Sequence, residues 1–287
     1  MQSSDYPSIY CSADELSLLS QKHFFLALTA HLALLIFAAI LSLINISGPL
    51  IAILQLITLL SVLFCSIYLF SFRPDRLWYA GRAVAESIKT ITWRYVSRAE
   101  PFQGNDTDAR AHFSKRLKAI VEQNAEIFRA VTTRLDAPQI TQVMETMRSQ
   151  SLENRWNIYM QDRVSEQLAW YAKKANFNKG MSKKFFWALI FVNSIAVLCA
   201  IFRIIFSEQT FWPTDIFVAT SASLLGWMQA KRFSELSASY ALAAHEINFI
   251  KEQSIIPNND QDFSLFVGDT ENAFSREHTQ WAARRDI

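Results

Sequence analysis

The chain has 287 residues, of which 51% are hydrophobic and only 19% are charged. A soluble domain usually carries about 25% charged residues, so this composition favours a membrane protein. The formal net charge of +2 is too small to indicate a nucleic-acid partner. Few glycines (6) and prolines (7) disfavour an all-β design and suit long helices.

The three cysteines are isolated from one another in the sequence, at Cys11, Cys65 and Cys199. No two of them have the spacing of a metal site or a redox motif. We therefore expect no disulfide framework, no zinc site and no cofactor.

Two apolar segments come first, and both reach the roughly 20 residues that cross a bilayer core. They are Phe24–Ile44 and Leu50–Phe70, with only the sequence NISGP between them. This short connection predicts a tight helical hairpin. The first segment is too long for a signal peptide and lacks a small-residue cleavage site.

The stretch that follows, RPDRLWYAGRAVAESIKTITWRYVSRAEPF (Arg73–Phe102), predicts a helix with two distinct stripes. Its apolar seam recurs at alternating spacings of 4 and 3, at Leu77, Gly81, Val84, Ile88, Ile91 and Tyr95. Beside it run Trp78, Arg82, Glu86, Lys89 and Trp93. In this second stripe Glu86 can pair with Arg82 and with Lys89. The tryptophans at its ends indicate that a partner helix or lipid headgroups cover part of it.

The middle of the chain predicts further helices. The sequence NDTDARAHFSKRLKAIVEQNAEIFRAVTTRL (Asn105–Leu135) offers Asn105 or Asp106 as N-cap and has an apolar stripe along its length. A shorter helix is expected from Pro138 to Met147. Another is expected over Leu152–Asn178, where it can run on into a membrane segment.

Two more apolar segments follow, Phe185–Phe206 and Trp212–Ala230. The second is the weakest of the four because Asp215 lies near its start and Gln229 near its end. Beyond it, Gly268–Asp269 predicts a helix boundary. A helix after that boundary would place Phe274, His278, Trp281 and Arg285 on one face.

Basic residues mark the cytoplasmic ends of membrane segments. Here they follow the second segment, precede the third and follow the fourth, at Arg73, Arg76, Arg82, Lys173, Lys174, Lys179, Lys183, Lys184, Lys231 and Arg232. The hairpin tips contain no lysine, and Arg203 is the basic residue near the second tip. We expect the N-terminus, the C-terminus and the long middle region to be cytoplasmic.

The predicted order of elements repeats after about 150 residues. AVAESIK (Ala83–Lys89) and LAAHEIN (Leu242–Asn248) occupy similar places after the two hairpins. We expect a first hairpin unit with a cytosolic helix at residues 1–103, a helical connector at residues 104–150 and a second hairpin unit with C-terminal cytosolic helices at residues 151–287.

Three sequence motifs resemble those of the SLATT proteins. They are RLWYAGRAVAESIKTITWRYVSRAEPF (Arg76–Phe102), RVSEQLAWYAKKANFN (Arg163–Asn178) and ENAFSREHTQW (Glu271–Trp281). The resemblance covers most of the chain and implies a membrane effector of bacterial conflict systems, proposed to open pores and depolarise the cell. Relatives are often encoded beside cyclic-nucleotide synthases or nucleotide-sensing domains. A nucleotide second messenger or a cytosolic sensor protein is therefore the implied partner, although this chain has no recognisable nucleotide-binding domain.

Polar residues inside the membrane segments are candidates for a pore lining or for helix contacts. They are Gln55, Thr58, Ser61, Asn193, Asp215, Thr220 and Ser223. Small and hydroxyl residues also hold transmembrane helices together, so helix adhesion is the plainer interpretation. Asp215 is costly at membrane depth unless it faces water or a partner, although Arg203 could neutralise it.

The cytosolic candidates are Trp78, Arg82, Glu86, Lys89 and Trp93, together with Glu277, His278 and Trp281. They form either an ion-pair network that holds a helical bundle or a surface that couples a cytosolic event to the membrane helices. Glu277 and His278 have no second metal ligand at suitable spacing, and no catalytic triad or phosphate-binding loop is apparent. We do not expect an enzyme.

The sequence thus predicts an all-α integral membrane protein, with four transmembrane helices in two hairpins that extend into a cytosolic helical layer. The resemblance implies that this membrane is the bacterial inner membrane. The protein's predicted partners are the lipid bilayer and further copies of the chain. The function that the resemblance implies is a pore-forming effector in antiphage defence. The alternative is a non-conducting scaffold or sensor that recruits a cytosolic partner.

Overall fold

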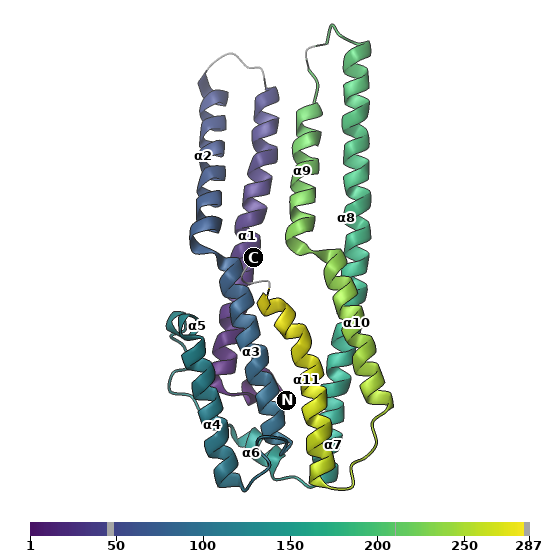
Figure 1. The fold of residues 1–287 in the computed structure, drawn as a ribbon. Coiled ribbons are helices and arrows are strands. Elements are labelled where there is room, and N and C mark those ends of the chain that lie inside the picture. Colours follow the sequence, from purple (N-terminus) through teal and green to yellow (C-terminus); the bar gives the residue numbers. More distant parts are fainter. Residues whose placement is uncertain (45–48, 210, 284–287) are drawn as a thin grey trace. The chain divides into compact units, whose positions relative to one another are not determined.

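The computed structural model describes residues 1–44, 49–209 and 211–283, with side chains described as far as residue 275. This part of the chain is helical throughout and contains no strand (Figure 1). The elements, in chain order, are η1 (Ser3–Asp5), α1 (Ser8–Leu43), α2 (Pro49–Phe72), α3 (Pro74–Val96), α4 (Asp106–Gln123), α5 (Ala125–Ala130), α6 (Gln142–Arg148), α7 (Leu152–Ile158), η2 (Tyr159–Ser165), α8 (Glu166–Ile205), α9 (Thr214–Lys231), α10 (Phe233–Glu252) and α11 (Asp260–Ala283).

The helices form two compact units, each assembled from separate parts of the chain. Unit 1 contains Met1–Gln21, Asp75–Lys173 and Ser239–Ile287, and unit 2 contains Lys22–Pro74 and Lys174–Ala238. The boundary falls inside α1 and close to the middle of the helical stretch that ends with α8. The three sequence regions expected at residues 1–103, 104–150 and 151–287 describe a repeat along the chain, and that repeat stays a prediction.

Three helical stretches are long and apolar enough to cross a membrane. They are Ser8–Leu43, Pro49–Val96 and Leu152–Ile205. They cover the first three segments expected from the sequence, apart from the last residue of the first and of the third. The fourth expected segment forms α9, which has 18 residues and is not among these three. The structure thus confirms an all-helical chain with three helices able to span a membrane, and the fourth span stays a prediction.

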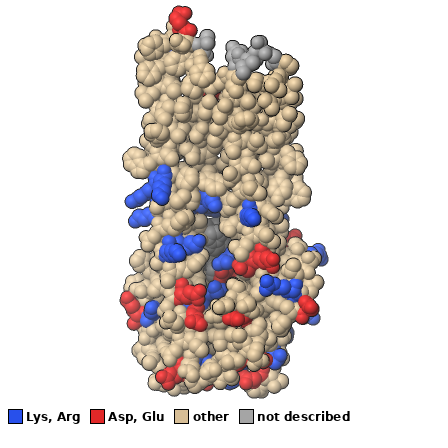
Figure 2. Space-filling view, turned by 180° about the vertical axis from the view of Figure 1, so that it is seen from behind, with Lys and Arg blue, Asp and Glu red and all other residues tan. Residues whose placement is uncertain are grey.

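The helices of unit 2 bury little of their apolar surface within one chain. In the most apolar part of Leu152–Ile205 no residue is buried. On the face shown in Figure 2, the surface of these helices is almost free of charged side chains, whereas charged side chains are frequent on unit 1. This surface needs lipid or other copies of the chain to cover it.

Unit 1, in contrast, has a buried core rich in aromatic side chains. The ring of Trp93 packs edge-on against Tyr159 at 5.8 Å, and Tyr159 packs against Phe263 at 6.0 Å. A second cluster stacks Tyr95 on Phe113 at 4.5 Å. These contacts join α3, α4, η2 and α11, so unit 1 has the packed interior that unit 2 lacks.

Helices α1 and α3 approach each other closely at Gly81. A Cβ atom at this position would lie 3.1 Å from the Ala13 carbonyl oxygen and 3.2 Å from Cβ of Ser17. The Ser17 hydroxyl donates a hydrogen bond to the Trp78 carbonyl at 3.1 Å. A glycine in the predicted apolar seam therefore permits this helix contact.

Two predicted helix boundaries are wrong. The Asn105 side chain caps α4, as expected, by accepting from the Asp108 amide, but the helix does not continue to Leu135. It breaks at Asn124, α5 ends at Ala130, and the Leu135 side chain is exposed. Gly268 does not end a helix, because α11 starts earlier, where the Asn259 side chain accepts from the Asp262 amide, and continues through the glycine.

Two smaller differences concern the helices around residue 150. The helix expected from Pro138 starts at Gln142 instead, where the Thr141 hydroxyl accepts from the Met144 amide. The helix expected over Leu152–Asn178 does run on into the membrane segment. It contains, however, a seven-residue π-helix, Tyr159–Ser165, that the sequence did not predict.

Candidate functional site

The predicted stripe on α3 forms an ion-pair cluster with α1. The guanidinium of Arg82 binds the Glu86 carboxylate at 2.5 Å and the Asp14 carboxylate of α1 at 3.3 Å. Glu86 is 1% exposed and Lys89 is half-buried. Burial lowers the pKa of Lys89, while the nearby Glu86 carboxylate partly opposes this shift. The expected pairing of Arg82 with Glu86 is therefore present, and it reaches a neighbouring helix.

The tryptophans at the ends of this stripe have different surroundings. Trp93 is buried, and its indole nitrogen donates to the Tyr6 hydroxyl at 2.9 Å. Trp78 is half-buried and stacks on Tyr79 at 4.5 Å. Burial raises the pKa of Tyr6 above its usual value, so this hydroxyl keeps its proton.

A second, fully buried ion pair joins η2 to α11. The guanidinium of Arg163 donates to the two carboxylate oxygens of Glu271 at 2.8 and 2.7 Å, and these side chains are 1% and 0% exposed. The Tyr159 hydroxyl also donates to Glu271, at 3.1 Å. The Arg163 guanidinium lies over the Phe274 ring, 4.7 Å from its centroid.

Electrostatics keep Arg163 charged in spite of its burial. Burial by itself lowers the pKa of Arg163, but the Glu271 carboxylate outweighs it and raises the pKa above its usual value. One guanidinium nitrogen, Nη1, has no hydrogen-bond partner among the described residues. The pair thus ties η2 to α11 with two strong, directional hydrogen bonds.

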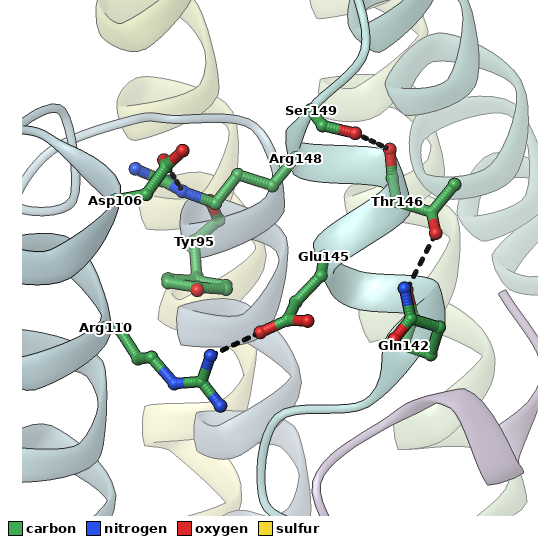
Figure 3. Close-up of a pocket in the computed structure, with 8 residues that line it drawn as sticks. All are labelled: Tyr95, Asp106, Arg110, Gln142, Glu145, Thr146, Arg148 and Ser149. Carbon is green, nitrogen blue, oxygen red and sulfur yellow. Dashed lines mark hydrogen bonds and ion pairs between the residues drawn. The ribbon is translucent and has the colours of Figure 1, made fainter.

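A cavity of about 360 Å³ lies where α3, α4 and α6 meet (Figure 3). Across it, Arg110 of α4 binds Glu145 of α6 at 2.6 Å. Arg148 is buried beside it and donates to the Asp106 carboxylate at 3.0 Å and to the Tyr95 and Phe102 carbonyls. The lining is completed by Gln142, Thr146 and Ser149.

The lining of this cavity is polar and close to charge balance. Each of its two arginines faces one of its two carboxylates, so the cavity itself does not favour a highly charged ligand. Its volume is at the lower end of the range for small-molecule sites, roughly 300–1,000 Å³. It can accept a small polar molecule that makes several hydrogen bonds.

Two of the candidate membrane residues, Asn193 and Ser223, form hydrogen bonds between helices of unit 2. The Ser221 hydroxyl of α9 donates to the Asn193 side-chain oxygen of α8 at 2.7 Å. The Ser223 hydroxyl of α9 donates to the Leu32 carbonyl of α1 at 3.4 Å. These contacts match the adhesion expected of small and hydroxyl residues.

The other membrane candidates make no contact between helices through a described hydrogen bond. The hydroxyls of Thr58, Ser61 and Thr220 each donate to a carbonyl four residues earlier in their own helix. Gln55 is half-buried on α2. Asp215 is exposed in the first turn of α9 and forms no ion pair with Arg203 or any other described residue.

The C-terminal candidates Glu277, His278 and Trp281 belong to α11, but their side chains lie outside the described ones. Sequence reasoning did not single out Arg163, Glu271 or Arg148. A signal was present, because Glu271 continues the apolar spacing of Phe263, Val267 and Phe274 on α11. Among the described residues no group of His, Cys, Asp or Glu could hold a metal ion.

Helices able to span a membrane, joined to a packed helical unit with buried ion pairs, define a helical membrane protein. The chain belongs to the SLATT family. Residues 7–156 match the model described as SMODS and SLOG-associating 2TM effector domain 3, and residues 159–281 match the one described as SMODS and SLOG-associating 2TM effector domain 1. Neither description names an enzymatic activity. No curated protein and no solved structure matches the chain.

Proposed function

We propose that this protein is a membrane effector whose copies assemble in the bacterial inner membrane and open a path for ions. The effector role has its support in the two family matches, each to a domain described as having two transmembrane helices. Two such domains in one chain also support four spans in two hairpins. Basic residues beside the spans support cytoplasmic termini, and the defence role is the one that the family resemblance implies.

The observation that carries this proposal is the environment of Asn193. This residue lies within the apolar part of α8, and it is exposed. Its side-chain oxygen accepts from Ser221, whereas no described residue accepts a hydrogen bond from its amide nitrogen. An amide donor is costly in hydrocarbon unless it finds a partner, so we propose that water or a second copy of the chain meets it.

In this proposal the binding site for the trigger is in unit 1. A nucleotide second messenger or a cytosolic sensor protein would bind there. The polar, charge-balanced cavity beside Arg110 and Glu145 supports a small polar trigger of low charge. Arg148 connects this cavity to the Tyr95 carbonyl at the end of α3, a helix that follows directly on α2. Ligand binding could therefore alter how the end of α3 is held.

The test is ion flux through the purified protein in liposomes, measured with a potential-sensitive dye while the oligomeric state is determined on the same sample. We expect Asn193→Leu to abolish the flux because it removes the polar group from the proposed path. Val197→Leu, an apolar change at an exposed position of the same helix, is the control and should conduct normally. A defined wild-type oligomer that never conducts would favour the non-conducting scaffold instead.

A further inference from the structure

Unit 2 has an unbalanced distribution of charge. Its first segment, Lys22–Pro74, contains no Asp or Glu, and its second contains only Glu208, Asp215 and Glu235. Basic residues are more numerous, and several occur close to the boundary with unit 1 in the sequence. Six of them define a cation belt: Lys22, Lys179, Lys183, Lys184, Lys231 and Arg232.

Contacts inside unit 2 bring the α1 and α9 members of the cation belt to one level. The Lys231 ammonium lies 3.3 Å from the centroid of the Phe25 ring and 5.0 Å from that of Trp227. Phe25 and Trp227 in turn pack edge-on at 5.6 Å. Lys22 precedes Phe25 by three residues, which is about 4.5 Å along a helix. Lys22, within α1, and Lys231, the last residue of α9, therefore lie at the same level.

A second set of contacts brings the cation-belt residues of α8 to the same level as those at the junction of α9 with α10. The Ser182 and Ser234 hydroxyls are hydrogen-bonded at 2.8 Å, and the Phe185 and Phe233 rings stack at 5.4 Å. Lys183 and Lys184 lie between Ser182 and Phe185 in the chain. Arg232, in the left-handed conformation with φ 50°, directly precedes Phe233. The belt thus continues from α9 to α8 at this level.

Most of the cation belt is not neutralised within the chain. Arg232 binds Glu235 through a salt bridge. The five lysines form no ion pair with a described residue, and Lys22, Lys179, Lys183 and Lys184 are exposed. The Lys231 ammonium rests on aromatic rings. On the face shown in Figure 2, basic side chains border the uncharged surface of the unit 2 helices.

We propose that the cation belt binds the headgroup phosphates of anionic phospholipids. It lies where the apolar helix segments end, which is the depth at which headgroups meet a membrane protein. Near an anionic lipid surface each Lys or Arg strengthens association about fivefold. On α8, Lys179 and Lys183 are four residues apart and lie on the same side of the helix, and Lys184 follows about 100° further round. This inference holds whether or not the protein conducts ions.

The test measures the binding of phosphatidylglycerol and phosphatidylcholine to the full chain in neutral detergent by native mass spectrometry. We expect wild type to prefer phosphatidylglycerol, and K179Q/K183Q/K184Q to lose that preference at least fivefold. The control, K115Q/R116Q/K118Q, removes three exposed cations from α4 in unit 1 and should retain the preference. Circular dichroism should give both variants the wild-type unfolding temperature, because the altered side chains are exposed.

Three outcomes would overturn the inference. One is equal binding of the two lipids by wild type, and another is an equal loss in the control variant. The third uses inorganic phosphate, added against chloride at matched ionic strength. If phosphate displaces phosphatidylglycerol, the belt is a site for free phosphate rather than for a lipid surface.

Discussion

Arg163 and Glu271 place two opposite charges side by side in the interior of unit 1, although 108 residues separate them in the chain. Removing one partner of a buried pair leaves the other charge buried and unpaired, which costs about 3–5 kcal/mol. We expect Glu271→Met to lower the free energy of unfolding by about this amount. Arg163→Met combined with Glu271→Met should recover most of the loss, because the unpaired charge is then gone.

Urea unfolding followed by circular dichroism measures both effects. The exposed pair of Lys118 with Glu122, at 3.7 Å, supplies the control, since exposed pairs contribute less than about 1 kcal/mol. If the Glu271 variant is no less stable than Glu122→Met, the buried pair does not hold η2 to α11.

Lys89 is the opposite case, a cation whose burial works against its charge. Its lowered pKa means that the folded protein binds the proton less tightly than the unfolded chain does. Stability should therefore rise with pH between this lowered pKa and the usual value of 10.5. We expect Lys89→Met to raise the unfolding temperature at pH 7 and to flatten its dependence on pH above 7.

Differential scanning fluorimetry across this pH range makes the measurement. Lys118→Met, at a side chain that is 77% exposed, should follow the wild-type curve. A Lys89 variant that is less stable than wild type at pH 7 would show instead that its attraction to Glu86 outweighs the cost of burial.

At the scale of elements, η2 sets the rotation of the helix that follows it. An α-helix continuing from the buried Tyr159 would turn Glu166 and Trp170 toward the interior. The structure instead buries Val164 and Tyr171, while Glu166 is exposed and Trp170 is half-buried. The π-helical turns accommodate one extra residue. They therefore allow α7 and the first turns of α8, as far as Tyr171, to present their apolar sides to the core of unit 1.

A deletion within η2 should consequently be tolerated where one in α8 is not. Removing the exposed Gln161 leaves a regular α-helix in which Tyr159, Val164 and Tyr171 still share one face. We expect its unfolding temperature, followed by circular dichroism, to stay within a few degrees of wild type. Deletion of the exposed Ala169 turns every later side chain by about 100° and should destabilise the protein strongly. Equal losses in the two variants would contradict this account of η2.

Helices and their buried faces were predicted well where a single apolar periodicity runs along the segment. The α3 seam is one example, since Gly81, Val84 and Ile88 are all buried. Helix boundaries were predicted less well, because several residues along the chain can cap a helix. Asn259 caps α11, so this helix starts before Gly268, where the sequence predicted a boundary. The π-helix depends on how Tyr159 and Tyr171 pack against other helices. The partnership of Arg163 with Glu271 likewise needs the fold, because neither residue identifies the other along the chain.

At the scale of the whole molecule, the polar membrane residues divide into two groups. Ser221 and Ser223 already satisfy their hydroxyls inside one chain, which matches the adhesive role rather than a pore lining. Asn193 retains an amide nitrogen directed to no described acceptor, and Asp215 is exposed without an ion pair. If copies of the chain form a conducting path, it follows that these two side chains are better candidates to line it than Thr58 or Thr220.

The number of spans depends on whether α9 crosses the membrane, and labelling of single cysteines can decide this. In a background with Cys11, Cys65 and Cys199 changed to serine, Glu208→Cys reports on the end of α8 and Lys251→Cys on α10. Both positions are exposed. Four spans with cytoplasmic termini predict that a membrane-impermeant maleimide labels Glu208→Cys in intact spheroplasts but labels Lys251→Cys only after lysis.

Lys118→Cys on α4 serves as the control in the same experiment, because the long middle region is expected in the cytoplasm. It should be labelled only after lysis. Labelling of both Glu208→Cys and Lys251→Cys from outside would show that α9 does not cross, so that three helices span the membrane. In that case Asp215 would lie outside the bilayer core, which would remove the cost of an unpaired carboxylate there.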